Sequence, residues 1–492
     1  MKKYILSIDQ GTTSSRAILF DHEGHPCAMA QREVECLFPK PGWVEADALG
    51  IWVSVIDVVN EALVKENVTM DSVDSIAITN QRETTIIWDK NTGLPVYHAV
   101  IWQSRQSSEI CEKLEDYKDL IHEKTGLLIN PYFSASKIRF ILDHIPNGQQ
   151  RAEAGELLFG TVDSWIIFKM TKGKVHATDV SNASRTMLYN INTNAWDEEL
   201  LKLFNIPKNM LPKVCPSSHR FGAASFFSKE VDICGVAGDQ QAALFGQTCF
   251  EVGESKNTYG TGCFMLLNIG DKPVLSKKGL LTTVAWQIGD KITYALEGSV
   301  FVGGSVVQWL RDQMRMLHEA AESEKYALEV NDTNGMYFVP AFVGLGTPYW
   351  DDDARGSAFG MTRGTTKSHF IRACLEAIAY QCKDVFEVMS KETSCSLKNL
   401  KVDGGATKNK FLMQFQSDIL HTKIMLPSCL ETTALGVAYL AGLASGFYKD
   451  LEEIKSIHTY QAIFEPEMDE KTVKEKYDGW LKAIEATRVF KQ

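Results

Sequence analysis

The chain has 492 residues, of which 45% are hydrophobic and 23% charged, and its net charge at pH 7 is −11. This length exceeds one typical core, so two or more domains are expected, and the composition is that of a soluble globular protein. The charge is spread along the chain without a basic cluster, which argues against nucleic-acid binding. The most apolar late stretch, residues 434–447, is too short for membrane insertion.

The 11 cysteines form no Cys-x-x-Cys pair and no cluster at zinc-ligand spacing. This odd, scattered set predicts reduced thiols and a cytoplasmic location. The apolar run at residues 4–8 is too short for a signal peptide and is interrupted by Asp9. The chain has no Gly-x-x-x-x-Gly-Lys-Ser/Thr loop, so a nucleotide would need another phosphate cradle.

Two short apolar runs, residues 4–8 and 17–20, predict strands of a β-hairpin. The turn between them, residues 9–16 (DQGTTSSR), carries an acid, a glycine, hydroxyls and an arginine. Main-chain N–H groups, hydroxyls and arginine suit phosphate oxygens, and the aspartate can reach a metal ion. An ordinary polar hairpin is the alternative, because short motifs also occur by chance.

Helices and strands alternate through the rest of the chain, which predicts an α/β class. The predicted helices are residues 47–65, 109–117, 136–144, 163–170, 304–319, 369–390, 409–420, 433–446 and a polar tail helix at 466–492. Beyond the hairpins, the predicted strands are residues 74–79, 85–88, 336–340 and 400–402.

Residues 80–85 (NQRETT) lie between two apolar strands and lack the glycine, proline or aspartate of a tight turn. Aromatic residues follow at 101–103 (IWQ) and 130–133 (NPYF). Arginine and glutamate can bind hydroxyl groups, and aromatic rings can form the walls of a pocket for a small polyol. A solvated turn at 80–85 is the alternative.

Residues 238–243 (GDQQAA) follow an apolar run and place Asp239 at the start of a predicted helix. This position indicates either a cleft carboxylate or a helix N-cap, for which aspartate is favoured, and the two roles can coincide.

A second hairpin near mid-chain has predicted strands at 255–259 and 263–268 around a Gly-Thr-Gly turn. Its distance from the first hairpin is about half the chain, which suggests a duplicated architecture. A third glycine-bearing turn, residues 402–406 (VDGGA), precedes a predicted helix. Glycines there allow close approach of a ligand, and a helix N-terminus favours phosphate, although a plain turn is the alternative.

Eight segments resemble the signature segments of the FGGY carbohydrate kinase family, in the family's order and over nearly the whole chain. They are residues 9–16, 80–85, 101–103, 131–133, 238–247, 257–265, 344–351 and 402–406. The similarity is closest to the members that phosphorylate glycerol, because xylulokinases and ribulokinases share the phosphate hairpins but not the NQRETT segment.

The resemblance implies an α/β, two-domain actin/hexokinase/Hsp70-like fold, with duplicated ribonuclease-H-like cores and a cleft between the domains. The expected N-terminal domain is residues 1–250, with the glycerol pocket and the first phosphate loop. The expected C-terminal domain is residues 251–492, with the second phosphate loop, the adenosine site and the C-terminal helix.

The implied activity is ATP-dependent phosphorylation of glycerol to sn-glycerol 3-phosphate, with Asp239 as proton acceptor and Mg²⁺ at Asp9 and Asp239. The implied substrate-binding residues are Arg82, Glu83, Trp102, Tyr132, Asp239, Gln240 and Phe264. The implied ATP-binding residues are Thr12, Thr13, Ser14, Arg16, Thr261, Gly304, Gln308, Gly405 and Asn409. A homo-oligomer, dimer or tetramer, is also implied.

Two alternative functions stay open at this point. One is a kinase of another small polyol or ketose on the same fold, and the other is a non-enzymatic nucleotide switch of the actin/Hsp70 type. A switch needs no polyol pocket, so the substrate group argues against it. Regulatory loops of some relatives are not expected here: residues 226–232 lack the glycine and arginine of fructose 1,6-bisphosphate sites, and residues 221–231 lack a phosphorylatable histidine.

Overall fold

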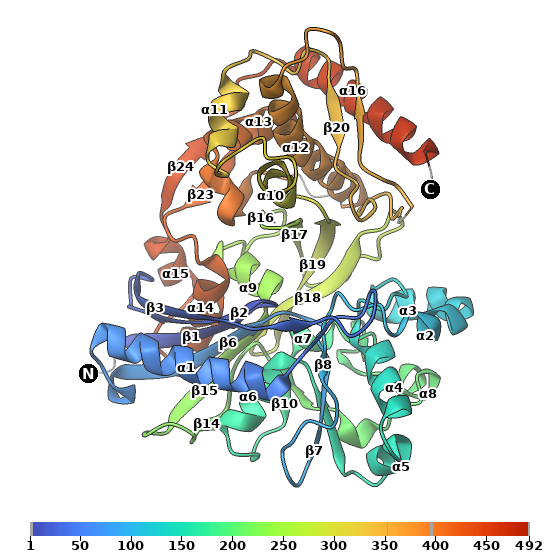
Figure 1. Ribbon diagram of the computed structural model, residues 1–492. Coiled ribbons are helices and arrows are strands. Elements are labelled where there is room, and N and C mark those ends of the chain that lie inside the picture. The colour runs from blue at the N-terminus through green and yellow to red at the C-terminus, as the bar shows by residue number, and fades with distance from the viewer. Residues whose placement is uncertain (1–2, 352, 394–396, 491–492) are drawn as a thin grey trace.

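One mixed sheet of 13 strands connects the two halves of the chain in the computed structural model, which describes residues 3–351, 353–393 and 397–490 (Figure 1). Its strand order is β24-β23-β22-β16-β17-β19-β18-β14-β15-β6-β1-β2-β3. Helices cover both faces of this sheet, as expected for an α/β protein. None of the helices in the described part of the chain is long and apolar enough to cross a membrane.

The first half of the chain builds a five-stranded unit in the order β3-β2-β1-β6-β15. Its strands are β1 (Tyr4–Gln10), β2 (Ser14–Phe20), β3 (Pro26–Glu33), β6 (Val73–Asn80) and β15 (Val231–Gly238). The first three strands pair antiparallel, whereas β6 pairs parallel with both β1 and β15. The predicted opening hairpin is therefore confirmed as β1 and β2.

The second half repeats this arrangement in the order β19-β17-β16-β22-β23. Its strands are β16 (Ser255–Tyr259), β17 (Cys263–Gly270), β19 (Lys291–Val300), β22 (Leu400–Asp403) and β23 (Ile424–Pro427). The three hairpin strands pair antiparallel, and β22 pairs parallel with β16 and β23. The same strand order and the same directions in both units confirm the predicted duplication and the fold class.

Two further strands, β18 (Leu281–Ile288) and β14 (Ser218–Ala224), join the units into one sheet, and β24 (Tyr460–Phe464) forms its edge. The short strands outside it are β4 (Cys36–Leu37), β5 (Glu45–Ala46), β7 (Ile86–Asp89), β8 (Ala99–Val100), β9 (Leu157–Gly160), β10 (Ala177–Asp179), β11 (Tyr189–Asn190), β12 (Ala195–Trp196), β13 (Lys213–Cys215), β20 (Tyr337–Val339) and β21 (Ser357–Phe359).

The helices largely follow the predicted ranges. They are α1 (Ala48–Glu66), α2 (Ser108–Lys113), α3 (Lys118–Thr125), α4 (Ser134–His144), α5 (Gly148–Glu153), α6 (Val162–Met170), α7 (Val180–Ala183), α8 (Glu198–Leu203), α9 (Asp239–Gly246), α10 (Ser305–Asp312), α11 (Glu322–Leu328), α12 (Lys367–Glu392), α13 (Lys410–Leu420), α14 (Thr432–Ser445), α15 (Leu451–Ile457) and α16 (Glu470–Val489). Helix α1 shows why: Asp47 caps its first turn, its buried residues recur at helical spacing, and Asn67 ends it with φ 56°.

Three predicted boundaries are wrong. The helix predicted over 304–319 ends at Asp312, because the chain turns back there and Arg315 takes a left-handed φ of 52°. The helix predicted over 109–117 is divided between α2 and a 3₁₀ turn at Glu115–Tyr117. The tail helix begins only at Glu470, and residues 491–492 of that prediction lie outside the described residues.

Helices α9 and α14 occupy equivalent places, since each follows the fifth strand of its unit, and they pack against each other. Glycines allow this close crossing. A Cβ on Gly436 would lie 1.8 Å from the carbonyl oxygen of Ala242, and one on Gly246 would lie 2.0 Å from that of Thr432. The two halves of the chain therefore touch backbone to backbone at this point.

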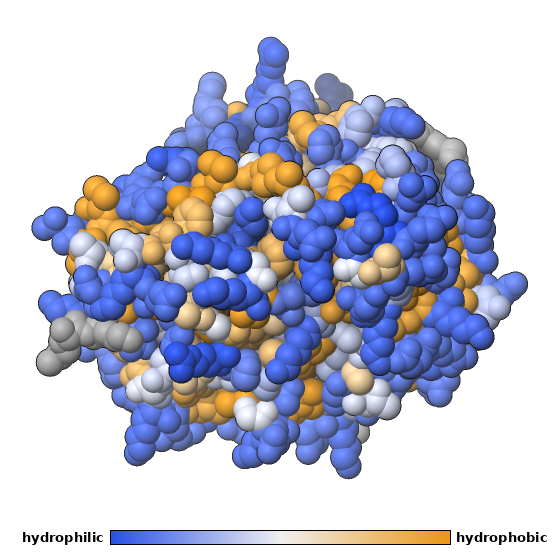
Figure 2. Space-filling view, turned by 90° about the horizontal axis from the view of Figure 1, so that it is seen from below, coloured by the Kyte–Doolittle hydropathy of each residue, from blue (hydrophilic) through white to orange (hydrophobic). Residues whose placement is uncertain are grey.

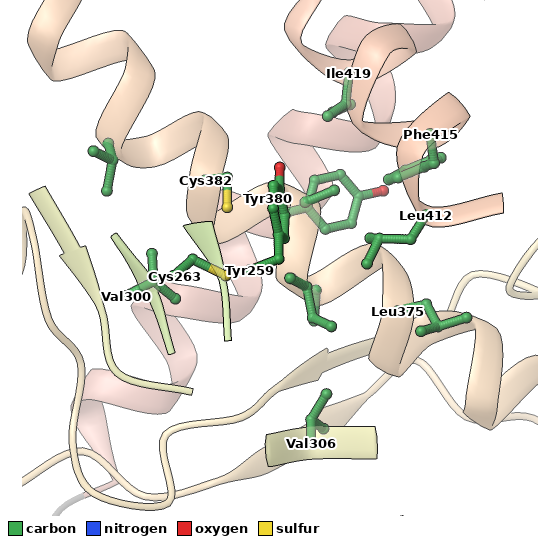
Figure 3. Close-up of a cluster of buried hydrophobic side chains, with 14 of the residues drawn as sticks. Tyr259, Cys263, Val300, Val306, Leu375, Tyr380, Cys382, Leu412, Phe415 and Ile419 are labelled. Atoms are coloured by element: carbon green, nitrogen blue, oxygen red, sulfur yellow. The ribbon is translucent and has the colours of Figure 1, made fainter. Parts of the chain in front are cut away.

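The hairpin of the second unit is supported from behind by a buried cluster, which Figure 3 shows. Tyr259, at the end of β16, donates from its hydroxyl to Oε1 of Gln416 at 2.7 Å. Tyr380 and Phe415 pack edge to face beside it, from α12 and α13. By contrast, the face seen from below is mostly hydrophilic, with apolar areas between (Figure 2).

Candidate active site

The carboxyl ends of β6 and β15 bring two predicted site residues together. Arg82 follows β6, and Asp239 opens α9 directly after β15. Because β6 and β15 are parallel neighbours, their ends meet at one edge of the sheet. The Nε atom of Arg82 lies 3.0 Å from Oδ1 of Asp239, so the pair forms an ion pair at this edge.

The polar segment that contains Arg82 is buried, so the solvated-turn alternative is wrong. None of residues 80–85 is more than 3% exposed. Glu83 takes a left-handed φ of 61°, which is unfavourable for a residue with a side chain. Hydrogen bonds from the hydroxyls of Ser134 (3.0 Å) and Thr85 (3.1 Å) to the Glu83 carbonyl oxygen hold that conformation.

A buried glutamate of the second half completes a charged network. Glu297, on β19, is 0% exposed and accepts two hydrogen bonds from the Arg82 guanidinium, at 2.5 Å and 3.1 Å. Arg185 donates to Glu297 at 3.2 Å and to Glu83 at 2.6 Å. Asp239, Arg82, Glu297, Arg185 and Glu83 therefore alternate in charge along one continuous chain of contacts.

The surroundings of the two buried glutamates in this network differ. Burial would raise the pKa of Glu297, but the guanidiniums of Arg185 and Arg82 outweigh it and lower the pKa to about 2. Burial raises the pKa of Glu83, because Arg185 and Arg82 do not fully compensate there. Glu297 is thus the firmly ionised centre of the network.

Aromatic rings line the region beside the network. The rings of Trp102 and Tyr132 lie 5.4 Å apart, edge to face, and the Arg185 guanidinium lies 5.6 Å from the Tyr132 ring. Trp102 also donates from Nε1 to the hydroxyl of Thr12 at 2.8 Å, which links this wall to the first hairpin. The buried ammonium of Lys137 donates to the consecutive carbonyls of residues 131–133 and so fixes the loop that carries Tyr132.

Gln240 and Phe264 lie close to the same edge. Oε1 of Gln240 accepts from Nζ of Lys256 at 2.5 Å, and burial lowers the pKa of this lysine to about 8. Phe264 lies opposite Ser299 in the β17–β19 register, and Leu266 lies opposite Glu297. Phe264 and Glu297 are therefore diagonal neighbours on one face of the sheet.

The two glycine turns of the second unit come together. The amide of Gly304 donates to the carbonyl of Gly260 at 2.9 Å, and that of Gly303 donates to Thr261 at 2.8 Å. A Cβ on Gly304 would lie 3.9 Å from Cβ of Ala406, within the 402–406 turn, and Gly405 beside it has open space. These turns leave backbone accessible where a ligand can approach.

The remaining residues predicted to bind ATP lie just after these glycine turns or in the first hairpin. Asn409 caps α13 by accepting from the amide of Leu412 at 2.9 Å, and Gln308 is exposed on α10. In the first hairpin, Thr13 lies in the turn and Ser14 begins β2, which carries Arg16. Nη1 of Arg16 lies 3.0 Å from Oε2 of Glu431. The structure thus pairs Arg16 with an acid of the opposite unit.

Asp9 lies opposite Arg16 in the β1–β2 register, and its carboxylate is close enough to interact with Asp239. Burial raises the pKa of Asp9 to about 7, Arg16 opposes this shift, and Asp239 adds to it. Such mutual repulsion is relieved by a bound cation. No group of three metal-ligating side chains occurs among the described residues. Two carboxylates nevertheless fit Mg²⁺ that is bound together with phosphate and water.

Three residues of this region were not predicted, and a second interpretation was wrong. The missed residues are Arg185, Glu297 and Lys137. The one sequence feature that could have indicated them is a single charged residue within an apolar segment, as at Glu297 in YALEGSV. The N-cap interpretation of Asp239 is wrong. The N-cap of α9 is Gly238, so the Asp239 side chain is available to pair with Arg82.

The comparisons with known proteins cover the whole chain. Residues 4–246 match the model of the FGGY family of carbohydrate kinases, N-terminal domain, and residues 255–445 match that of the C-terminal domain. A glycerol kinase of Bacillus licheniformis is 58% identical over 496 aligned residues and is covered completely, as is this chain.

Two solved structures are also similar to this chain over nearly its whole length. A Plasmodium falciparum glycerol kinase with ADP has a TM-score of 0.93 and 39% identity, over 98% of both chains. A Lactobacillus acidophilus xylulose kinase has a TM-score of 0.88 at 22% identity, over 98% of both chains, which shows the shared fold alone.

Proposed function

The chain belongs to the FGGY family of carbohydrate kinases, and on this premise we propose that it phosphorylates glycerol. It transfers the γ-phosphoryl group of ATP to a terminal hydroxyl of glycerol and produces sn-glycerol 3-phosphate and ADP. The observation that carries this proposal is the meeting of Asp239 with the Arg82–Glu83 segment, beside the rings of Trp102 and Tyr132. Its full-length relatives named glycerol kinase support the choice of glycerol.

Phosphoryl transfer needs positioning, charge neutralisation and an acceptor for the hydroxyl proton. We assign the acceptor role to Asp239, whose side chain is 32% exposed and lies beside Arg82. Arg82 and Glu83 bind hydroxyl groups of glycerol as donor and acceptor. Trp102, Tyr132 and Phe264 enclose its carbon chain, and Gln240, held by Lys256, lies beside the acceptor.

The phosphates of ATP bind between the two hairpins in this proposal. Thr12, Thr13, Ser14 and Arg16 contribute from the first turn and Thr261 from the second. Gly304, Gln308, Gly405 and Asn409 contact the rest of the nucleotide. Asp9 and Asp239 would hold Mg²⁺, which supplies positive charge to the transferred phosphoryl group when bound.

We also propose the domain bounds, the cellular location and the oligomeric state. The proposed domains are residues 1–250 and 251–492, and the gap between the two matched family models, residues 247–254, supports a boundary at this point. The chain acts in the cytoplasm as a homo-oligomer, dimer or tetramer. Limited proteolysis, cell fractionation and light scattering test these three points.

The test of function is ADP release by the purified chain with a panel of acceptors: glycerol, dihydroxyacetone, erythritol and pentuloses. We expect glycerol to give the highest kcat/KM. Preference for a pentulose would instead identify a kinase of another polyol or ketose. If no acceptor increased ADP release, the nucleotide-switch alternative would replace the kinase proposal.

A further inference from the structure

We propose that Glu297 is a positioning residue for the acceptor pocket: one buried carboxylate of the second half orients both Arg82 and, through Arg185, Glu83. This inference rests on the proposed function, in which Arg82 and Glu83 bind the hydroxyl groups of glycerol. Glu297 itself lies behind them and is not assigned a contact with the substrate.

The contacts place Glu297 between the two arginines. Arg82 donates to both carboxylate oxygens, through Nη1 to Oε2 at 2.5 Å and through Nη2 to Oε1 at 3.1 Å. Arg185 donates through Nη2 to the same Oε1 at 3.2 Å. Such a two-point contact fixes the plane of the Arg82 guanidinium as well as its position. With Nη1 and Nη2 held in this way, Nε of Arg82 faces Asp239 at 3.0 Å.

The second branch of the network reaches Glu83. Arg185 is 0% exposed, and its Nε donates to Oε1 of Glu83 at 2.6 Å. Its guanidinium also lies 5.2 Å from the ring of Phe133 and 5.6 Å from that of Tyr132. Arg185 therefore links Glu83, the proposed hydrogen-bond acceptor for a glycerol hydroxyl, to the rings of Phe133 and Tyr132. Glu297 in turn holds Arg185.

The charges of Arg82 and Arg185 explain why a carboxylate is needed at position 297. Arg82 and Arg185 repel each other, since each is a buried cation and Arg82 opposes the protonation of Arg185. Glu297 lies between them and compensates both. Without its charge, the guanidiniums would separate or recruit Asp239 and Glu83 more tightly. Either movement displaces the groups that bind substrate.

Stability alone does not account for this network. A buried ion pair is often replaced by apolar residues of similar volume without loss of stability, because desolvation offsets the Coulomb attraction. Ala295, on the same face of β19, and Leu266, opposite Glu297 in the β17–β19 register, are apolar and fully buried, so this face of the sheet accepts such residues. Precise placement of reacting groups, by contrast, has a large effect on rate, and an error of about 1 Å costs on the order of 100-fold.

The test is the Glu297→Gln variant of the full chain, measured by steady-state kinetics with glycerol and ATP varied separately. We expect the KM for glycerol to increase at least tenfold, while the KM for ATP changes less than twofold. Glu297→Asp, which keeps the charge, should recover part of the glycerol affinity.

Glu376→Gln is the matched control. Glu376 is also a buried glutamate of the second half, 1% exposed and 3.0 Å from an arginine, Arg372, but it lies on α12, outside the network. Its replacement should lower the melting temperature and leave the KM for glycerol unchanged. If Glu297→Gln behaved in the same way, the positioning role would be refuted.

A second variant keeps the inference testable if Glu297→Gln does not fold. Arg185→Gln/Glu297→Gln removes one charge of each sign, so the buried network stays balanced. An unchanged KM for glycerol in this folded double variant would overturn the proposal. If the unmodified chain preferred another polyol, only the proposed function would fail, and the same comparison with that polyol would still test Glu297.

Discussion

The Nε atom of Arg82 lies 3.0 Å from Oδ1 of Asp239, at the edge where β6 and β15 end side by side. This contact joins the proposed hydroxyl-binding residue to the proposed proton acceptor. The same guanidinium is held from behind by Glu297, so the orientation of Asp239 depends on a side chain of the opposite unit. The acceptor pocket is therefore one electrostatic assembly with contributions from both halves of the chain.

Replacement of Asp239 by Asn tests the proton acceptor. The amide keeps the shape and can still lie beside Arg82, but it cannot accept a proton at neutral pH. We expect kcat to fall about 100-fold or more, as loss of a general base does, with glycerol binding still measurable by calorimetry. Unchanged turnover would rule out this role for Asp239.

Replacement of Glu431 by Gln tests a contact between the two units. Arg16, a proposed phosphate ligand, pairs with Glu431 at 3.0 Å, and both side chains are about one-third exposed. An exposed pair of this kind stabilises by about 0–1 kcal/mol. Since bound ATP must compete for Arg16, Glu431→Gln should lower the KM for ATP by up to about fivefold.

Glu61→Gln serves as the control for this variant. Glu61 also forms ion pairs at the surface, with Arg32 and Lys65, but neither partner belongs to the proposed ATP site. Its replacement should leave the KM for ATP unchanged. A KM for ATP that rises in Glu431→Gln would mean that Glu431 supports nucleotide binding and does not compete with it.

Much of this architecture could be predicted because its signals are local. The two hairpins carry alternating apolar residues around short turns, and helices such as α1 show apolar residues at helical spacing with a capping aspartate. The strand order could be expected only through the family resemblance, since parallel pairing joins strands that are far apart in sequence. The edge strand β24 was missed, because its residues are only half-buried and alternate with exposed ones.

The residues of the site also divide into those with a local sequence signal and those without one. Arg82, Glu83 and Asp239 stand in segments whose composition is unusual for a turn or helix start, so they were predicted. Glu297 and Arg185 stand singly in apolar or small-residue segments, and their importance comes from a contact between the halves of the chain. No local pattern encodes such a contact, because the partners are more than 100 positions apart.

The close crossing of α9 and α14 predicts that one methyl group added at Gly436 lowers the stability of the fold strongly. A Cβ on Gly436 would lie 1.8 Å from the Ala242 carbonyl oxygen, so Gly436→Ala forces the two helices apart. We expect a loss of at least 2 kcal/mol in the free energy of unfolding, within the range of about 1–3 kcal/mol or more for overpacking. Urea denaturation measures this loss.

Gly50→Ala is the matched control, because Gly50 lies on the exposed side of α1 and its nearest atom to a new Cβ is 3.4 Å away. In that helix the change should be neutral or stabilise the fold by up to about 1 kcal/mol, since alanine favours helix. Equal effects of the two substitutions would contradict the close crossing.

A half-buried histidine should make the fold less stable in acid. The Nε2 atom of His176 lies 2.7 Å from the Phe159 carbonyl oxygen, and its ring packs edge to face on Trp88. Burial lowers the pKa of His176 to about 4, against the opposing effect of this hydrogen bond. The neutral ring is therefore the form that the folded state accommodates.

The sign of the pH dependence follows from which state binds the proton. Above pH 6.5, His176 is neutral in both states and its contribution is constant. Between pH 6.5 and about 4, the unfolded chain binds the proton and the folded chain does not, so stability decreases as the pH falls. The loss amounts to about 3 kcal/mol at most, at about 1.4 kcal/mol per pH unit.

The His176→Gln variant should remove this dependence, because an amide can still donate to the Phe159 carbonyl and does not titrate. We expect a flatter curve of unfolding free energy between pH 6.5 and 4 than in the unmodified chain, as measured by urea denaturation at a series of pH values. His458, whose pKa burial also lowers to about 4, contributes a second, separate share of the slope. The double variant His176→Gln/His458→Gln should therefore be flatter than either single variant, and identical slopes in all four chains would show that neither ring excludes a proton in the folded state.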